Sequence, residues 1–372
     1  MNPKILVINP GSTSLKIAIF EKDKLILKKI AKHDTNVIRQ FKTAFDQLDF
    51  RLNIVLDFIK AENINLKDID IFVGRGGLIR PLESGTYLVN EEMIDDLVSG
   101  KYGIHACNFG GIIASRLAKT VNKEAYIVDP VIIDEFDEVA RVSGYKGIER
   151  HSVFHALNQK AIAKRYSEEH HKIYSDLSLI VAHLGAGISV GWHKQGRVVD
   201  VNCALGGDGP FSPERAGDLP IFDLIDLCYA NKFTKEEIKN ELVTKGGLIS
   251  YLDTYNGIEI SQMIKDGNSE ALLYLKAMAY QIAKEIGGLY FVAKGKIDAV
   301  ILTGGLSYNL DLINLIKGYL PDFVNLKIYE GEDELSALAH GVLRVYEGKE
   351  EIKNELVTKG GLISYLDTYN GI

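Results

Sequence analysis

Paired cysteines and long apolar runs are both missing from this sequence, and each absence removes a class of protein. Its 372 residues include only three cysteines, Cys107, Cys203 and Cys228, and no two of them form a Cys-x-x-Cys pair. We therefore expect buried thiols in a reducing compartment, the cytoplasm, with no disulfide and no cysteine-bound metal. No apolar run approaches the ~20 residues of a membrane helix, and a strand-like run follows Met1 directly. We expect neither a signal peptide nor a membrane partner.

Excess positive charge and a zinc-type spacing are missing as well. The chain carries 43 Lys and Arg against 50 Asp and Glu, a formal net charge of −7. This balance argues against a nucleic-acid partner. The nine histidines are too scattered for a zinc site. A site for an anionic ligand would therefore depend on locally placed arginines and backbone N–H groups.

Strand-like runs mixed with helical patterns predict an α/β fold of about two domains. The expected strands are 4–9, 15–20, 25–30, 70–74, 125–128, 178–183, 188–192, 197–201, 298–302 and 324–328. The expected helices are 37–61, 106–120, 154–168, 221–230, 268–294, 309–318 and 333–346.

A weak internal repeat suggests how these elements are grouped. Lys4 to Ile30 and Ser178 to Val201 both read as strand, glycine-containing turn, strand, short turn, strand. We expect two domains of related fold with mixed sheets flanked by helices, residues 1–165 and 166–332. The last helix, near 333–348, would pack back on the first domain. A cleft between two such domains is a favoured ligand site.

A second repeat is of a different kind. Residues 349–372 copy residues 235–258 without a single substitution. Natural repeats drift in sequence and usually come in three or more copies. We therefore expect 349–372 to be a non-native appendage, with a native end near residue 350. The mass of the natively expressed protein would decide this point.

The turn Asn9-Pro-Gly-Ser-Thr-Ser-Leu-Lys16 joins two strand-like runs. It offers the hydroxyls of Ser12, Thr13 and Ser14, a glycine that lets a ligand approach the backbone, and the charge of Lys16. A P-loop would need a following helix and a Gly-Lys-Ser/Thr ending, and both are absent. The turn is either a phosphate-binding hairpin or an ordinary Pro-Gly turn at a sheet edge.

Two further glycine turns follow predicted strands. In His183-Leu-Gly-Ala-Gly187, the absence of side chains at Gly185 and Gly187 would let backbone N–H groups meet phosphate oxygens. A tight sheet turn is the alternative, but the pairing with the first turn favours phosphate binding. Thr303-Gly-Gly-Leu-Ser307 could present amides to a nucleotide or be a plain strand-to-helix loop.

Two arginines lie in glycine-rich surroundings. Arg75 follows a predicted strand within Gly74-Arg-Gly-Gly77, where a guanidinium stays accessible to a carboxylate or phosphate. Arg215 lies in a long Gly/Pro-rich stretch, the kind of loop that carries function. A local ion pair with Glu214 is its other interpretation.

Acidic residues and histidines add weaker candidates. Asp129 ends a predicted strand, where ligand chemistry is common in α/β proteins, and helix capping is its alternative. His105 and His155 become informative only through their neighbours. Asp333 and Glu334 open the last helix, where they suit the helix dipole or could bind a metal.

Taken in order, these segments resemble the acetate and butyrate kinase family, within the sugar kinase, heat-shock 70 and actin superfamily. The resemblance runs through about residues 4–347. Its first motif is Asn9 to Lys16, its second is His183 to Gly187, and its adenosine motif is Thr303 to Ser307. It implies two domains of ribonuclease H-like (actin-like ATPase) fold.

Within this family the sequence is more similar to the butyrate-type members. Acetate-type members read Asn-Ala-Gly-Ser-Ser-Ser at the first turn and contain His-Arg-Val-Val-His-Gly. Here Pro10 and Gly74-Arg-Gly-Gly-Leu-Ile-Arg-Pro81 stand in their place. The resemblance implies reversible, ATP-dependent phosphorylation of butyrate, or of a branched acid such as isobutyrate, to the acyl phosphate. Acetate and propionate remain alternative substrates.

The resemblance also implies a role for each candidate residue. The catalytic residues would be Arg75, Asp129, His155 and Arg215, and the acid would contact Arg75, His105 and Asp129. ATP would be bound by Ser12, Ser14, Lys16, His183, Gly185, Gly187, Asn256, Gly257, Gly304, Gly305 and Ser307. Mg²⁺ would be bound by Asn9 and by Glu334 or its neighbour Asp333, a choice that depends on a shift of one residue.

A non-catalytic nucleotide-binding scaffold or an ATPase switch of the same superfamily is the alternative of a different class. Sugar kinases and ATPases of this superfamily usually place Asp in the first phosphate turn, whereas this chain has Asn9. The joint presence of Arg75, Asp129, His155 and Arg215 favours a kinase. The resemblance further implies a homodimer or a higher homo-oligomer.

Overall fold

The computed structural model describes residues 2–356 except 13, 39 and 42, so Thr13 of the first turn and most of the second copy lie outside the described residues. The chain forms two compact units. The first runs to Asp134 and resumes at Asp333, and the second is Glu135–Glu332. The structure places the boundary between Asp134 and Glu135 and not at residue 165, which lies inside helix α6 (Ala156–Glu169) of the second unit.

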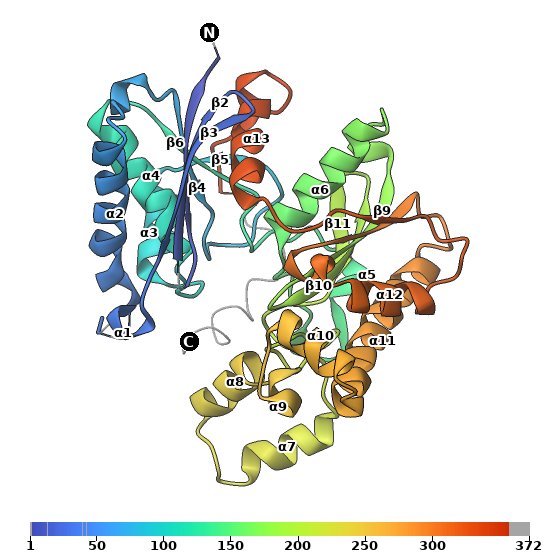
Figure 1. Ribbon diagram of the computed structural model, residues 1–372. Coiled ribbons are helices and arrows are strands. Elements are labelled where there is room, and N and C mark those ends of the chain that lie inside the picture. The colour runs from blue at the N-terminus through green and yellow to red at the C-terminus, as the bar shows by residue number, and fades with distance from the viewer. Residues whose placement is uncertain (1, 13, 39, 42, 357–372) are drawn as a thin grey trace. The chain divides into compact units, whose positions relative to one another are not determined.

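The first unit is built on one mixed sheet of order β14-β5-β6-β4-β1-β2-β3. Its strands are β1 (Lys4–Pro10), β2 (Ser14–Glu21), β3 (Lys24–Lys32), β4 (Ile71–Arg75), β5 (Thr86–Leu88), β6 (Ala125–Val128) and β14 (Ile352–Lys353). Its helices are α1 (Thr35–Ile38), α2 (Gln47–Ala61), α3 (Glu91–Ser99), α4 (Asn108–Thr120) and α13 (Glu334–Tyr346). Helices α2, α3 and α4 lie on one side of the sheet and α13 on the other (Figure 1).

The second unit has a mixed sheet of order β11-β10-β9-β12-β13. Its strands are β9 (Ser178–Leu184), β10 (Ile188–Lys194), β11 (Arg197–Val201), β12 (Ala299–Thr303) and β13 (Leu326–Ile328), beside the separate hairpin β7 (Val142–Tyr145) and β8 (Ile148–Glu149). Its helices are α5 (Glu138–Arg141), α6, α7 (Ile221–Tyr229), α8 (Lys235–Thr244), α9 (Ile249–Leu252), α10 (Gly257–Lys265), α11 (Ser269–Val292) and α12 (Leu310–Tyr319).

The two sheets share one plan, which confirms the predicted α/β fold. In each unit three consecutive strands pair antiparallel, β1-β2-β3 and β9-β10-β11. A later strand then joins the first of the three in parallel, β4 beside β1 and β12 beside β9. The carboxyl ends of β1 and β4, and likewise those of β9 and β12, meet at one edge, where ligand sites of α/β sheets form.

Both sheets are buried on both faces, which is why their central strands are almost wholly apolar. In β9, Leu179 and Val181 pack in the cluster that includes Ala163 of α6. The alternate residues Ile180 and Ala182 belong to the larger cluster that includes residues of α11 and α12. The period of two along a strand thus places a core on each side of the sheet.

Helices α3, α8 and α10 were not expected from the sequence, and α2 begins only at Gln47. The unexpected helices bury few side chains, and α8 and α10 bury only one each, Ile238 and Ile260. Their start is set instead by caps. Thr234 forms a reciprocal capping box with Glu237, and the Asn90 and Asn256 side chains accept from the N–H groups of Met93 and Ile258.

Part of the second copy joins the first unit's sheet, because Ile352 and Lys353 form the strand β14. Ile352 pairs in parallel with Thr86 of β5, and the Lys353 ammonium donates to the Ser84 carbonyl at 2.8 Å. Among the described residues, no helix is both long enough and apolar enough to cross a membrane.

Candidate functional site

Four predicted residues meet at the carboxyl ends of β1 and β4. The Asn9 amide donates to the Glu334 carboxylate at 2.7 Å, and Arg75 forms an ion pair with it at 2.6 Å. Lys16, opposite Asn9 in the β1–β2 ladder, lies 3.5 Å from the same carboxylate. One carboxylate thus gathers three groups that come from β1, β2 and β4.

The position of Arg75 is fixed by close backbone packing between β4 and α4. Helix α4 crosses β4 so tightly that a Cβ on Gly74 would lie 2.1 Å from the Gly110 carbonyl carbon. Only glycine leaves room for this approach. The Arg75 side chain is 21% exposed, so it combines the ion pair with access to a small anion.

The structure distinguishes the two acidic residues at the start of α13. Asp333 is the N-cap: its carboxylate accepts from the Ser336 N–H at 3.1 Å and from the Ser336 hydroxyl at 2.5 Å. Glu334, one residue later, carries the contacts to Asn9, Arg75 and Lys16. Glu334 is therefore the acidic residue beside Asn9.

Glu334 and Asn9 are oxygen donors of the kind that Mg²⁺ accepts. In phosphotransfer sites this ion is held by one or two carboxylates together with phosphate oxygens and water. Within the described ranges, no three His, Cys, Asp or Glu side chains gather as a metal site. The donor set therefore fits a Mg²⁺ ion that arrives with a nucleotide, and it does not fit a resident ion with an all-protein shell.

His105 lies beside the first turn. Its Nε2 is 3.2 Å from the Ser12 hydroxyl, and its Nδ1 accepts from the Cys107 N–H at 3.3 Å. An Nδ1 that accepts leaves the proton of the neutral ring on Nε2, directed at Ser12. Ser14 begins β2, and its carbonyl accepts from the Gly11 N–H at 2.7 Å, which closes the turn.

Asp129 is 3% exposed and has a left-handed backbone, with φ of 40°. Its carboxylate accepts from the Ser84 hydroxyl at 2.7 Å and from the Gly85 N–H at 2.9 Å, while its own N–H donates to the Gly85 carbonyl. A non-glycine residue held in this region is strained, and such strain is concentrated at functional sites. Helix capping does not explain Asp129, because β6 ends just before it and no helix of the described chain starts there.

In the second unit, His155 and His183 stack with ring centroids 3.8 Å apart and an interplanar angle of 11°. His155 Nδ1 is 3.0 Å from the Ser189 hydroxyl, and His183 Nδ1 is 2.8 Å from Asn158 Oδ1. The Glu332 carboxylate is 3.4 Å from His183 Nε2. The stacked rings are thus held by Ser189, Asn158 and Glu332.

Arg215 lies against the second glycine turn. A Cβ on Gly187 would lie 2.2 Å from its Nη1, and the guanidinium donates to the Ala204 carbonyl. The Ser212 hydroxyl accepts from the Arg215 N–H at 3.1 Å and donates to the Ala186 carbonyl. The loop of Arg215 is thus tied to the turn Gly185–Gly187.

The two segments expected at the adenosine pocket also meet. Thr303 pairs with His183, so the loop that begins at Gly304 starts beside the second glycine turn. The Asn309 amide donates to the Gly257 carbonyl at 3.2 Å, and the Asn256 side chain caps α10. The Ser307 hydroxyl is buried and bonded to Gly304 and Gly331, so its role here is to shape the loop. Gly305 begins a short 3-10 turn in the same loop.

Sequence reasoning missed three residues that support these groups: Arg51 of α2, Asn158 of α6 and Glu332. Arg51 donates to the carbonyls of the first turn, while Asn158 and Glu332 hold His183. None carries a local signal, since an arginine or an asparagine inside a helical pattern normally reads as a solvent-facing residue.

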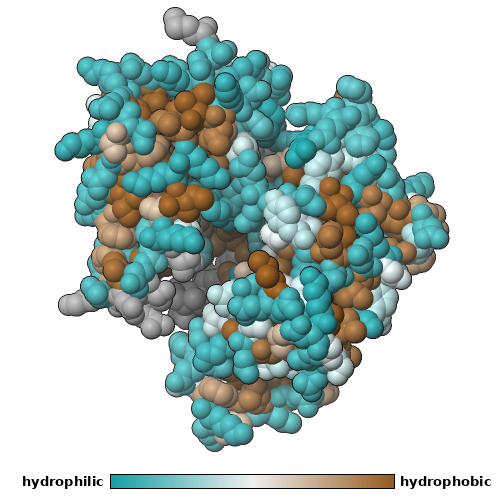
Figure 2. Space-filling model, in the orientation of Figure 1, coloured by the Kyte–Doolittle hydropathy of each residue, from teal (hydrophilic) through white to brown (hydrophobic). Residues whose placement is uncertain are grey.

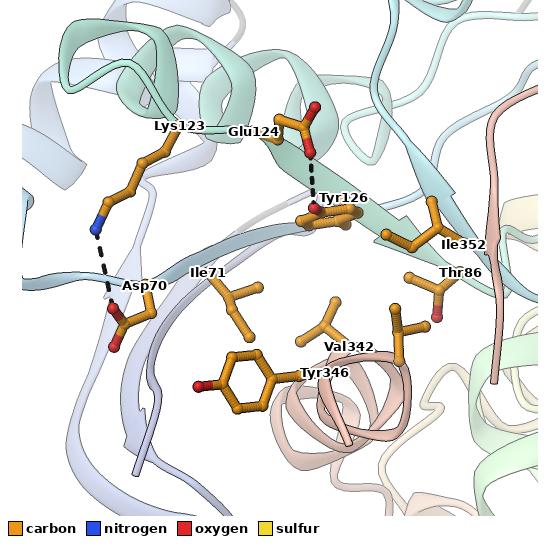
Figure 3. A pocket seen from close by; sticks show the side chains of 10 residues that line it. Asp70, Ile71, Thr86, Lys123, Glu124, Tyr126, Val342, Tyr346 and Ile352 are labelled. Atoms are coloured by element: carbon orange, nitrogen blue, oxygen red, sulfur yellow. Dashed lines mark hydrogen bonds and ion pairs between the residues drawn. The ribbon is translucent and has the colours of Figure 1, made fainter. Parts of the chain in front are cut away.

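A cavity of about 430 Å³ in the first unit lies away from these groups. As Figure 3 shows, Ile71, Val342 and Tyr346 approach one another from β4 and α13. The Tyr126 hydroxyl donates to Glu124 at 3.0 Å, and Lys123 lies 3.9 Å from Asp70. None of the predicted site residues lines this cavity, so we place no substrate there.

Comparison with known proteins gives consistent results. The Acetokinase family profile matches residues 140–318. Butyrate kinase 1 of Clostridium acetobutylicum is 50% identical over 350 residues, which cover 94% of this chain and 99% of that protein.

Solved structures share the fold. The crystal structure of Porphyromonas gingivalis acetate kinase has a TM-score of 0.72 at 18% identity, covering 92% of this chain and 100% of that one. Acetate kinase from Entamoeba histolytica has a TM-score of 0.72 at 19% identity, covering 91% and 98%. At these identities the likeness establishes the two-domain α/β fold.

Proposed function

Because this chain belongs to the acetokinase family, whose members transfer a phosphoryl group from ATP to a carboxylate, we propose that its acid substrate is butyrate or a branched acid of similar size. The reaction is ATP + butanoate = ADP + butanoyl phosphate, and it runs in both directions. The supporting observation is the 50% identity to a butyrate kinase over nearly the whole of both chains.

The chemistry requires alignment and neutralisation of charge. A carboxylate oxygen forms a bond to the γ-phosphorus as the bond from that phosphorus to the β,γ-bridging oxygen breaks, and ADP leaves with the electron pair. The acid is already deprotonated at neutral pH, so no strong general base is needed. The protein must hold two anions in line and stabilise the charge on the equatorial oxygens.

We assign roles to the first-unit residues accordingly. Arg75 binds the substrate carboxylate or the transferring phosphoryl group, and His105 and Asp129 complete the acid site. Ser12, Ser14 and Lys16 bind the nucleotide phosphates. Glu334 and Asn9 would hold Mg²⁺ bound to the nucleotide, and this ion would neutralise phosphate charge there.

The second-unit residues have the remaining roles in this proposal. His155 and Arg215 stabilise charge in the transition state, and the turn His183–Gly187 binds phosphate oxygens through backbone N–H groups. Asn256, Gly257 and the loop Gly304–Ser307 bind adenosine. The contacts of Asn309 with Gly257 support the last assignment, because they bring the two segments together.

The decisive experiment measures ADP formation in a coupled assay with acetate, propionate, butyrate and isobutyrate. We expect acid-dependent turnover with the largest kcat/KM for butyrate or isobutyrate. A preference for acetate or propionate would overturn the butyrate assignment. ATP binding without acid-dependent turnover would instead indicate a nucleotide-binding scaffold or an ATPase switch.

Replacing Arg75 with alanine should raise the KM for the acid roughly tenfold or more, because a charge-assisted hydrogen bond to the carboxylate is lost. The measurement is the KM for the acid at saturating ATP. Arg80→Ala is the matched control, since Arg80 follows in the same glycine-rich segment but is paired with Asp96 at 2.7 Å. An unchanged KM in a folded Arg75→Ala protein would argue against the carboxylate role.

We also propose that the protein is a homodimer or a higher homo-oligomer and that α7 lies at the contact. Helix α7 buries none of its side chains, and Ile221, Phe222 and Tyr229 are 71%, 83% and 81% exposed. Figure 2 shows hydrophobic residues (brown) exposed among hydrophilic ones (teal) on the face that it draws. An exposed apolar helix is well suited to a symmetric contact with its own copy.

Light scattering coupled to size-exclusion chromatography tests this contact. We expect the wild-type protein to elute as a dimer or larger and Phe222→Asp to elute as a monomer. Phe291→Asp, at an 81% exposed phenylalanine of α11, should leave the mass unchanged. A monomeric wild-type protein would contradict the proposal.

We propose the cytoplasm as the compartment. Burial raises the thiol pKa of Cys107 and of Cys203 to about 11, so both stay protonated and unreactive at neutral pH. ATP, the proposed co-substrate, is a cytoplasmic metabolite.

A further inference from the structure

Arg51 is a fully buried arginine near the start of α2. Its side chain reaches the first turn and donates to three of its carbonyls. Nη1 lies 2.9 Å from the Gly11 oxygen and 3.4 Å from the Ser14 oxygen, and Nη2 lies 3.3 Å from the Ser12 oxygen. One guanidinium therefore fixes the backbone on both sides of the turn.

Those contacts determine which way the turn's amides face. In a trans peptide the C=O and the following N–H point in opposite directions. With the Gly11 carbonyl directed at Arg51, the Ser12 N–H must point away from it. The inward carbonyls thus leave an outward N–H at the place where the proposed function puts phosphate oxygens.

The other groups around Arg51 are neutral and leave its positive charge uncompensated. Its other contacts are neutral: Nη2 donates to the Gln47 amide oxygen at 3.1 Å, and His33 Nε2 lies 3.3 Å from Nη1. Burial lowers the pKa of Arg51 to about 10, so it remains protonated at neutral pH. Burial and the Arg51 charge lower the pKa of His33, which favours the neutral ring as an acceptor.

No carboxylate pairs with Arg51 among the described residues, and its Nε is buried without a hydrogen-bond partner there. Isolated buried charge is costly. The turn's carbonyl dipoles offset part of that cost, and a phosphate bound to the outer side of the turn would offset more. A bound anion is therefore expected to lower the free-energy cost of burying the Arg51 charge.

Resting on the proposed function, we propose that Arg51 is a positioning residue that sets the first turn for the phosphates of ATP. It acts through the backbone of Gly11, Ser12 and Ser14 and touches neither ATP nor the acid. Its loss should weaken ATP binding selectively, whereas the acid site, built on Arg75, should retain its affinity.

The test compares Arg51→Lys and Arg51→Met with Arg116→Met. The control removes an arginine that also contacts α2, through Asp49 at 3.0 Å, but not the turn. The Kd for ATP is measured by calorimetric titration, and KM is measured separately for ATP and for the acid. Arg51→Lys should raise Kd and KM for ATP about tenfold or more, because a lysine ammonium cannot replace the several N–H donors of the planar guanidinium. KM for the acid should change less than about threefold, and Arg116→Met should match the wild type.

A folded Arg51→Lys protein with wild-type ATP affinity would overturn the inference, and so would equal rises in both KM values. Should neither variant fold, hydrogen exchange on the wild-type protein decides. ADP should then protect peptides covering residues 9–16 and 47–55, and unchanged exchange in both would overturn it. Because the Kd for ATP is measured without acid, absence of acid turnover in the wild type would refute only the proposed function.

Discussion

Replacing Arg215 with alanine is expected to lower kcat by roughly 10³-fold or more, within the range found for arginines that stabilise phosphoryl transfer. The guanidinium lies directly against Gly187 and is bonded to the Ala204 carbonyl, so its position is fixed before substrate binds. A preorganised charge of this kind stabilises the transition state without a cost of reorganisation. Steady-state kcat at saturating ATP and acid measures the effect.

Two further variants show that the loss is specific. Arg165→Ala removes an exposed arginine of α6 that pairs with Glu169, and it should keep wild-type kcat. Gly187→Ala should reproduce part of the loss, because its Cβ would occupy the place of the Arg215 guanidinium. A folded Arg215→Ala protein that loses less than tenfold would remove Arg215 from the mechanism.

Replacing Glu285 with glutamine is expected to stabilise the protein at pH 8 and to leave it unchanged near pH 4. Glu285, on α11, faces Arg150 and the carboxyl groups of Asp218, Asp200 and Asp208. Burial raises its pKa to about 7, and the three carboxylates add to the rise while Arg150 opposes it. Burial likewise raises the pKa of Asp208 to about 6.

The sign follows from proton binding. Between pH 4.5 and 7 the folded protein binds a proton at Glu285 that the unfolded chain releases, so this group makes stability fall as pH rises. With the pKa raised from 4.5 to about 7, the ionised Glu285 destabilises the folded protein at pH 8 by at most about 3 kcal/mol. Glutamine removes the charge and with it this penalty.

Urea unfolding at pH 4, 6 and 8 measures the difference between Glu285→Gln and the wild type. The gap should open progressively between pH 4.5 and 7 and then stay constant. Glu270→Gln removes the same charge from an exposed position of the same helix and provides the baseline. Equal stabilities of wild type and Glu285→Gln at pH 8 would contradict the buried-charge explanation.

Much of the fold was predictable because it rests on local pattern. Apolar runs such as Lys4–Pro10 and Ser178–Leu184 are long enough to read as buried strands, and the glycine turns between them mark where the chain reverses. The arrangement of the candidate site residues was harder to predict from the sequence. Choosing Glu334 over Asp333 depends on which residue caps α13, and a cap is decided by backbone geometry that two adjacent acids do not reveal.

Arg51 illustrates what the sequence could not indicate. It lies in an amphipathic pattern and reads as a solvated charge, yet it is fully buried because the turn 40 residues earlier supplies its acceptors. Such contacts between distant segments have no local signature. The predicted domain boundary differs from the observed one for a related reason. Helix α6 packs against β9 and therefore belongs to the same unit as the strand that follows it.

The two identical segments make the same point within one chain. Glu236–Lys239 lies in helix α8, behind the Thr234 cap, whereas the same four residues at Glu350–Lys353 follow Gly348 and end in strand β14. Identical local propensity gives two structures because only the first copy has a cap and only the second lies beside the edge strand β5. The neighbouring elements decide between the two.

This duplication also affects any experiment that identifies segments by mass. Trypsin releases Glu-Glu-Ile-Lys from both places, and the two peptides are isobaric and co-elute. A label, modification or cross-link found on that peptide would therefore be the sum of a helical and an extended site. Changing Ile352 to valine would separate the two masses by one methylene group and give each copy its own signal.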